Sequence, residues 1–83
     1  MAGRLVLYTR ARCGLCDEML AAARPIADRY GFDIESVDID REPDLVRRYN
    51  TAIPVLELDG TEITRYHLDA GAFEHALATA PDT

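Results

Sequence analysis

Two cysteines stand three residues apart in the segment Arg12-Cys13-Gly14-Leu15-Cys16, and the chain of 83 residues contains no others. At the start of a helix, residues three apart share a face, so two sulfur atoms at this spacing can close a disulfide without moving the backbone. A thiol at a helix start also meets free backbone amides and the positive end of the helix dipole, which favour the thiolate. The pair therefore predicts a redox-active dithiol.

Charged residues on both sides of the pair bear on the acidity of the first thiol. Arg10 and Arg12 favour a thiolate at Cys13, whereas Asp17 and Glu18, one helical turn further on, oppose it. We expect the amides and the arginines to prevail because they lie nearer to the sulfur. The sequence thus predicts a thiol at residue 13 that is more acidic than a free cysteine.

A metal site or a structural disulfide accounts less well for the cysteine pair. A closed zinc site needs four ligands, and the remaining soft ligands, His67 and His75, do not have the spacing of a zinc finger. A metal would then require a dimer that pools two cysteine pairs. A structural disulfide would close a loop too small to add much stability, and chance rarely places the two cysteines of a chain at this spacing.

Length and composition limit what else the chain can be. With 83 residues, 48% of them apolar, residues 1–83 are expected to form one small domain with one modest core. The formal net charge of -6 argues against binding to nucleic acid or to anionic lipid. The absence of a signal peptide or membrane span in this sequence predicts a cytoplasmic protein, where such a pair is more often catalytic than structural. We expect a monomer.

The elements that flank the cysteines follow from apolar patterning. The unbroken run Leu5-Val6-Leu7-Tyr8 predicts a strand buried on both faces and therefore central in a sheet. After the cysteines, apolar residues recur at three- and four-residue steps up to Tyr30, which predicts a helix with one buried stripe. Pro25 is expected to kink or break this helix near Arg24, and Gly31 to close its C-terminus.

A second strand and a short helix are expected next. Phe32 to Ile39 predicts a strand parallel to the first, because a helix separates the two. Asp40 to Pro43 has the character of a helix start, and this second helix should end by Asn50. Its inward face is expected to comprise Leu45, Val46 and Tyr49.

The last third of the chain predicts a hairpin and a final helix. Alternating runs at residues 53–58 and 61–66 flank Asp59-Gly60, which favours an antiparallel hairpin with a tight turn. Pro54 must then stand at a strand start or in a special turn, because it cannot donate a ladder hydrogen bond. Asp69 is expected to cap a helix that ends before Pro81. The sum is an α/β fold, a four-stranded mixed sheet with helices on both faces.

This order, β-α-β-α-β-β-α, resembles the minimal thioredoxin fold and is most similar to glutaredoxins. The segment Leu7-Tyr8-Thr9-Arg10 resembles the aromatic, hydroxyl and basic residues that precede the glutaredoxin cysteines, and Ala52-Ile53-Pro54 resembles the cis-proline loop. The resemblance implies that Cys13 is the nucleophile and Cys16 the resolving thiol. It also implies that the Ile53 backbone, held by a cis Pro54, pairs with the substrate. The residues expected to bind substrate are Ile53, Pro54, Arg10, Arg12 and Leu15.

Two departures from the glutaredoxin pattern bear on the substrate. Gly14-Leu15 replaces the usual Pro-Tyr, and residues 64–69 lack the Gly-Gly segment that holds glutathione, so that only Asp69 matches. These departures favour a protein disulfide or a mixed disulfide as the substrate. The electron donor is expected to be an unidentified reductase or glutathione, and no dissociable cofactor is expected. The alternative is a binding or adaptor module of the same fold that shares an iron-sulfur cluster or metal across a dimer.

Overall fold

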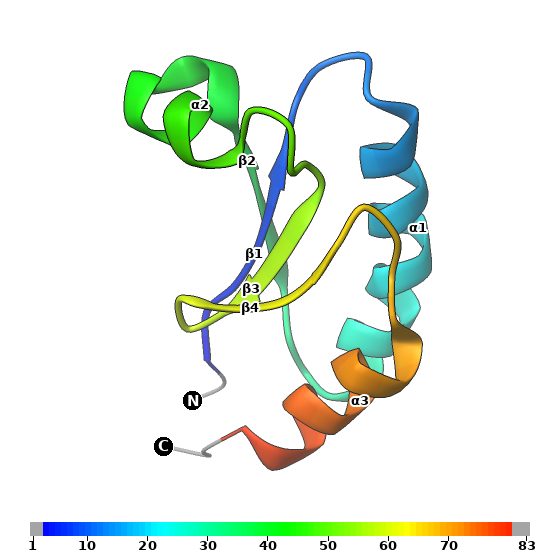
Figure 1. Cartoon of the computed structure of the whole chain (residues 1–83). Coiled ribbons are helices and arrows are strands. Elements are labelled where there is room, and N and C mark those ends of the chain that lie inside the picture. Colours follow the sequence, from blue (N-terminus) through cyan, green and yellow to red (C-terminus); the bar gives the residue numbers. More distant parts are fainter. Residues whose placement is uncertain (1–2, 81–83) are drawn as a thin grey trace.

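The computed structural model describes residues 3–80, and their elements follow the order expected from the sequence. The elements are β1 (Leu5–Thr9), α1 (Gly14–Arg29), β2 (Ile34–Asp38), the 3-10 helix η1 (Ile39–Arg41), α2 (Pro43–Tyr49), β3 (Val55–Leu58), β4 (Thr61–Arg65) and α3 (Ala70–Thr79). Figure 1 shows the path of the chain through these elements. Within residues 3–80, none of the helices is both long and apolar enough to cross a membrane.

The four strands form one mixed sheet in the order β2-β1-β3-β4. β1 runs parallel to β2 and antiparallel to β3, and β3 and β4 form the antiparallel hairpin. The central place of β1 confirms the prediction made from its unbroken apolar run. In the register between β1 and β3, Tyr8 lies opposite Val55. The end of β1, from which the cysteine loop emerges, therefore lies beside the start of β3, which Pro54 precedes.

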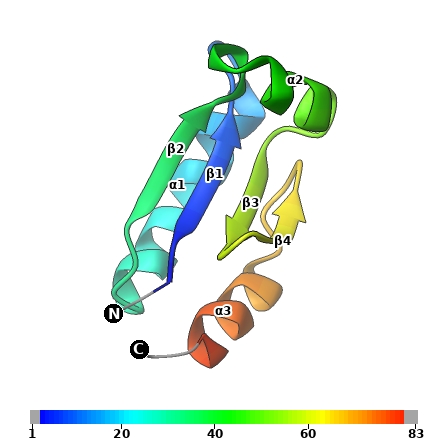
Figure 2. The same cartoon turned by 90° about the vertical axis from the view of Figure 1, so that its left-hand side faces the viewer.

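Helices cover both faces of the sheet, as predicted, with α1 and α3 on one side and α2 on the other (Figures 1 and 2). Each face has its own apolar cluster, because neighbouring residues of a strand point to opposite faces. The cluster under α1 and α3 contains Leu5, Leu7, Met19, Ala23, Ala27, Phe32, Leu56, Phe73 and Leu77. The cluster under α2 contains Ile39, Tyr49, Ala52 and Val55.

Helix α1 ends where the sequence predicts, but it is not broken at Pro25. The helix continues through Pro25 to Arg29, so the expected break near Arg24 does not occur. Pro25 is exposed, and Ala23 and Ala27 on either side of it are buried against the sheet, so packing outweighs the one lost hydrogen bond. Gly31, with φ of +76°, ends the helix as predicted, in the left-handed conformation that glycine adopts easily.

The hairpin and the last helix form as their local sequences predict. Asp59 and Gly60 have φ of +51° and +84°, the positive values that a tight primed turn requires. The Asp69 carboxylate accepts a hydrogen bond from the Ala72 N–H at 3.0 Å and so caps α3. The predicted strands are longer than the observed ones, since β2 begins at Ile34 rather than Phe32 and β3 at Val55 rather than Ile53.

A buried polar pair joins α2 to β3. The Tyr49 hydroxyl donates to a Glu57 carboxylate oxygen at 2.5 Å, and the two residues are only 5% and 7% exposed. The Tyr49 ring stacks on Tyr8 with 4.5 Å between ring centroids. Burial, followed by the hydrogen bond to Glu57, raises the pKa of Tyr49 to about 12. Because Tyr49 ends α2 and Glu57 lies within β3, the pair brackets the loop that contains Pro54.

Candidate active site

The two cysteines lie at the start of α1 and form a disulfide, with 5.2 Å between their Cα atoms. Cys13 is the N-cap in an extended conformation, and Cys16 lies in the first turn. Cys13 is partly exposed, whereas Cys16 is 1% exposed. The first sulfur therefore faces outward, and the second faces the core. Cys13 is thus accessible from solvent, whereas Cys16 is not.

The helix start provides hydrogen-bond donors around the Cys13 sulfur. The Cys16 N–H donates to Cys13 Sγ at 3.1 Å. The N–H groups of Gly14 and Leu15 donate to no other group among residues 3–80, as is usual in the first turn of a helix. Such donors, together with the helix dipole, stabilise a thiolate at the N-cap once the disulfide is reduced. Asp17 is the acidic residue of this first turn and opposes the effect.

The loop between β1 and α1 determines how the two arginines are placed. Arg12 is exposed and adopts a left-handed φ of +59°, which turns the chain into the helix. Together with Cys16, Asp17 and Asp38, it lines an open cavity of about 330 Å³ beside the disulfide. Arg12 is thus the arginine that remains exposed next to the cysteines.

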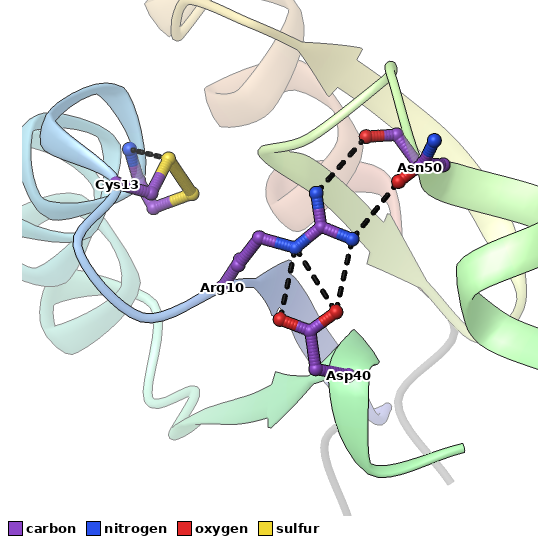
Figure 3. Close-up of a disulfide and its surroundings, with 5 residues drawn as sticks. Arg10, Cys13, Asp40 and Asn50 are labelled. Carbon is purple, nitrogen blue, oxygen red and sulfur yellow. Dashed lines mark hydrogen bonds and ion pairs between the residues drawn. A yellow bond between two sulfur atoms is a disulfide. The ribbon is translucent and has the colours of Figure 1, made fainter. Parts of the chain in front are cut away.

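Arg10 lies differently from the expectation. Its guanidinium binds the Asp40 carboxylate, with Nη2 at 2.9 Å from Oδ1, and contacts Asn50. Figure 3 shows the guanidinium directed toward these two residues, with the disulfide on the other side of the view. Asp40 thus offsets part of the charge of Arg10, and the effect of that charge on Cys13 stays a prediction. The Arg10 side chain instead links the loop after β1 to Asp40 and Asn50.

The loop before β3 presents an unpaired backbone at the end of the sheet from which the cysteine loop emerges. The Ile53-Pro54 peptide bond is cis, as predicted, and Pro54 is buried. The Pro54 carbonyl, which follows the cis bond in the chain, accepts a hydrogen bond from the Tyr66 N–H at 2.9 Å. Within the described residues, neither the N–H nor the carbonyl of Ile53 makes a hydrogen bond. Ile53 is therefore available to pair with an extended chain.

Exposed apolar side chains gather next to the disulfide. Leu15, between the two cysteines, is 38% exposed, and Tyr66, in the loop after β4, is 42% exposed. These two residues line one shallow groove, together with Glu18, Met19, Ala22, His67 and Leu68. The groove gives Leu15 a defined place in the site, beside Cys13 and at the edge of an apolar surface.

Three residues of the site have no local signal in the sequence. Asp40 and Asn50 hold Arg10, and the Tyr66 hydroxyl donates to the Thr51 carbonyl at 3.0 Å, which fastens the Pro54 loop to the loop after β4. Each of these contacts joins segments at least 15 residues apart, so no spacing of neighbouring residues indicates them. The one clue in the sequence is that Asp40 and Asn50 lie at the predicted start and the predicted end of the second helix.

The remaining potential ligands do not converge on the cysteines. His67 and His75 are exposed, and no group of three or more His, Cys, Asp or Glu side chains that could hold a metal ion occurs within residues 3–80. The Asp69 carboxylate, the one match to the glutathione-binding segment, already accepts from the backbone of α3.

Comparison with known proteins places the chain in a family. The model of the glutaredoxin-like domain (DUF836) matches residues 4–78. The uncharacterized protein Rv0508 of Mycobacterium tuberculosis is 30% identical over 76 residues, which cover 86% of this chain and 74% of that protein.

Solved structures agree with the observed topology. The solution NMR structure of protein Ne2328 from Nitrosomonas europaea is 34% identical, with a TM-score of 0.81 and coverage of 90% of this chain and 91% of that one. Thioredoxin 1 from Thermosipho africanus is 23% identical, with a TM-score of 0.61 and coverage of 90% and 94%, and shows the shared fold. The chain thus has a thioredoxin-like fold and belongs to the glutaredoxin-like domain family.

Proposed function

We propose that the protein is a thiol-disulfide oxidoreductase that reduces disulfides of other proteins. The Cys13 thiolate attacks one sulfur of the substrate disulfide, that bond breaks, and the leaving sulfur takes up a proton. Cys16 then loses its proton and attacks Cys13 Sγ, which releases the second substrate sulfur. Two electrons pass to the substrate, and the protein is left with the Cys13–Cys16 disulfide. An external thiol reductant restores the dithiol.

The observation that carries this proposal is the unequal placement of the two sulfurs at one helix start. Cys13 is partly exposed and accepts a hydrogen bond from the Cys16 N–H at 3.1 Å, whereas Cys16 is 1% exposed. The exposed sulfur suits attack on a bulky substrate. The buried sulfur suits the second step, because its target is the neighbouring Cys13 and the substrate chain cannot reach it.

The surroundings of Cys13 favour a polypeptide as the substrate. The unpaired Ile53 backbone can hydrogen-bond to an extended segment, and the apolar groove at Leu15 and Tyr66 can receive one of its side chains. No Gly-Gly segment follows the hairpin, and the carboxylate of Asp69 is used by α3, so glutathione lacks its usual contacts. We further propose that the protein acts as a monomer in the cytoplasm, with a reductase or glutathione as electron donor.

Two assays run side by side test the proposal. The first measures reduction of insulin disulfides by dithiothreitol with and without the protein, and the second measures glutathione-dependent reduction of a small mixed disulfide. We expect acceleration in the first assay, little in the second, and none in either for Cys13→Ser. A brown or metal-containing dimer without reductase activity would contradict the proposal and favour a module that binds a cluster or metal.

A further inference from the structure

Arg10 uses every nitrogen of its guanidinium in contacts with two distant segments. Nε lies 3.1 and 3.0 Å from the two carboxylate oxygens of Asp40, and Nη2 lies 2.9 Å from Asp40 Oδ1. Nη2 also donates to Asn50 Oδ1 at 3.0 Å, and Nη1 to the Asn50 carbonyl at 3.4 Å. The Arg10 side chain is 29% exposed, so solvent competes only partly for these contacts.

These contacts join three segments that meet at the cysteine end of the sheet (Figure 3). Arg10 belongs to the loop between β1 and Cys13, and Asp40 to the 3-10 helix that follows β2. Asn50 is the C-cap of α2 and the first residue of the loop that leads to Ile53 and Pro54. A single side chain therefore fixes the loop that carries the nucleophile against the loop that offers the unpaired backbone.

We propose that Arg10 is a positioning residue, held by Asp40, that keeps the Asn50–Pro54 loop in register with Cys13 through its bonds to Asn50. This inference rests on the proposed function, since the register matters when one substrate chain must meet both loops. The planar fork of arginine is required, because it reaches Asp40 and Asn50 at the same time, whereas the ammonium of lysine is a single point. The positive charge of Arg10 is compensated by Asp40 and does not act on the Cys13 thiolate.

Arg10→Lys is the central test, because it keeps the charge and loses the fork. We expect kcat/KM for a protein disulfide to fall about tenfold or more, mainly through a higher KM. Asn50→Ala should have a smaller effect in the same direction, because the Asn50 carbonyl remains as an acceptor. The matched control is Arg4→Lys, since Arg4 makes a similar fork to Glu35 at 3.0 and 2.9 Å, at the opposite end of β1. That control should leave KM unchanged.

The pH dependence of Cys13 alkylation in the reduced protein separates position from charge. If Arg10 acts by position, Arg10→Lys and Asp40→Asn should both leave the midpoint of the alkylation profile where it is in the wild type. A lower midpoint in Asp40→Asn would mean that the uncompensated Arg10 charge reaches the thiolate, and this result would overturn the inference. An unchanged KM in Arg10→Lys would overturn it as well.

Amide hydrogen exchange tests whether Arg10 orders the Asn50–Pro54 loop, and it requires no turnover of substrate. The Ala52 N–H donates to the carbonyl of Tyr49, the last residue of α2, at 2.9 Å, so its protection reports how well the start of the loop is ordered. We expect loss of protection at Ala52 in Arg10→Lys but not in Arg4→Lys. If the wild type reduced no disulfide, the proposed function would fail, and this exchange result alone would decide whether Arg10 orders the loop. Equal protection of the Ala52 N–H in the wild type and both variants would show that Arg10 does not order the loop.

Discussion

Replacing Tyr49 by Phe tests the buried pair that brackets the Pro54 loop. The substitution keeps the ring that stacks on Tyr8 and removes only the hydroxyl that donates to Glu57 at 2.5 Å. Glu57 is 7% exposed, and its carboxylate accepts from no other side chain or backbone group among the described residues. The variant therefore leaves a buried carboxylate without its donor, which costs about 1–3 kcal/mol in the free energy of unfolding.

The raised pKa of Tyr49 gives the same pair a pH signature. Its pKa rises from 10.0 to about 12, first through burial and then through the bond to Glu57. The folded state therefore favours the protonated hydroxyl, and this contribution is complete below pH 10 and is lost as the pH rises toward 12.

Urea unfolding at pH 7 and spectrophotometric titration of tyrosinate measure the two effects. We expect the free energy of unfolding of Tyr49→Phe to be lower than that of the wild type by about 1–3 kcal/mol. The tyrosinate titration of this variant should lack the step of highest pKa. The control Tyr30→Phe, at a residue 39% exposed, should change stability little. Tyr49→Phe combined with Glu57→Leu should recover much of the loss, because both polar partners are gone. Equal stability of wild type and Tyr49→Phe, or the same last titration in both, would show that the pair does not stabilise the fold.

Three further predictions follow from the site and its supports. Asp69→Ala removes the cap on the Ala72 N–H and should cost about 1 kcal/mol in urea unfolding, whereas an unchanged midpoint would show that the cap contributes nothing. In the reduced protein, alkylation against pH should show Cys13 reacting with a midpoint below the value of about 8.5 for free cysteine, and Cys16 reacting much more slowly. Titration calorimetry with glutathione should show weak or no saturable binding, and an affinity like that of ordinary glutaredoxins would contradict this.

Much of the fold was predictable because its signals are local. The run Leu5–Tyr8, the Asp59-Gly60 turn and the Asp69 cap each depend on neighbours within a few residues, and all three formed as expected. The exception is Pro25, where packing of Ala23 and Ala27 on the sheet outweighs a local helix breaker. The loss of one helix hydrogen bond at Pro25 can be predicted from the sequence, whereas the packing of Ala23 and Ala27 on the sheet cannot.

The candidate site divides in the same way. The cysteine pair is recognisable from its spacing, and the cis Pro54 from the resemblance of Ala52-Ile53-Pro54 to the glutaredoxin loop. The contacts of Arg10 with Asp40 and Asn50 span 30 and 40 residues, and the bond from Tyr66 to Thr51 spans 15, so they depend on how the loops meet at the sheet end. Arg10 lies close to Cys13 in the sequence, which suggests that its charge acts on the thiol. In the folded chain the Arg10 side chain is directed toward Asp40 and Asn50.

The assigned roles of the two cysteines are tested most directly by trapping the intermediate. Cys16→Ser keeps the exposed Cys13 thiol and removes the buried one. If Cys13 attacks and Cys16 resolves, as proposed, this variant should remain attached to its substrate as a mixed disulfide. Each variant would be expressed in cells and examined by non-reducing electrophoresis, followed by identification of the attached protein. We expect adducts on Cys16→Ser and none on Cys13→Ser. Similar amounts on both variants, or adducts on neither, would contradict these roles.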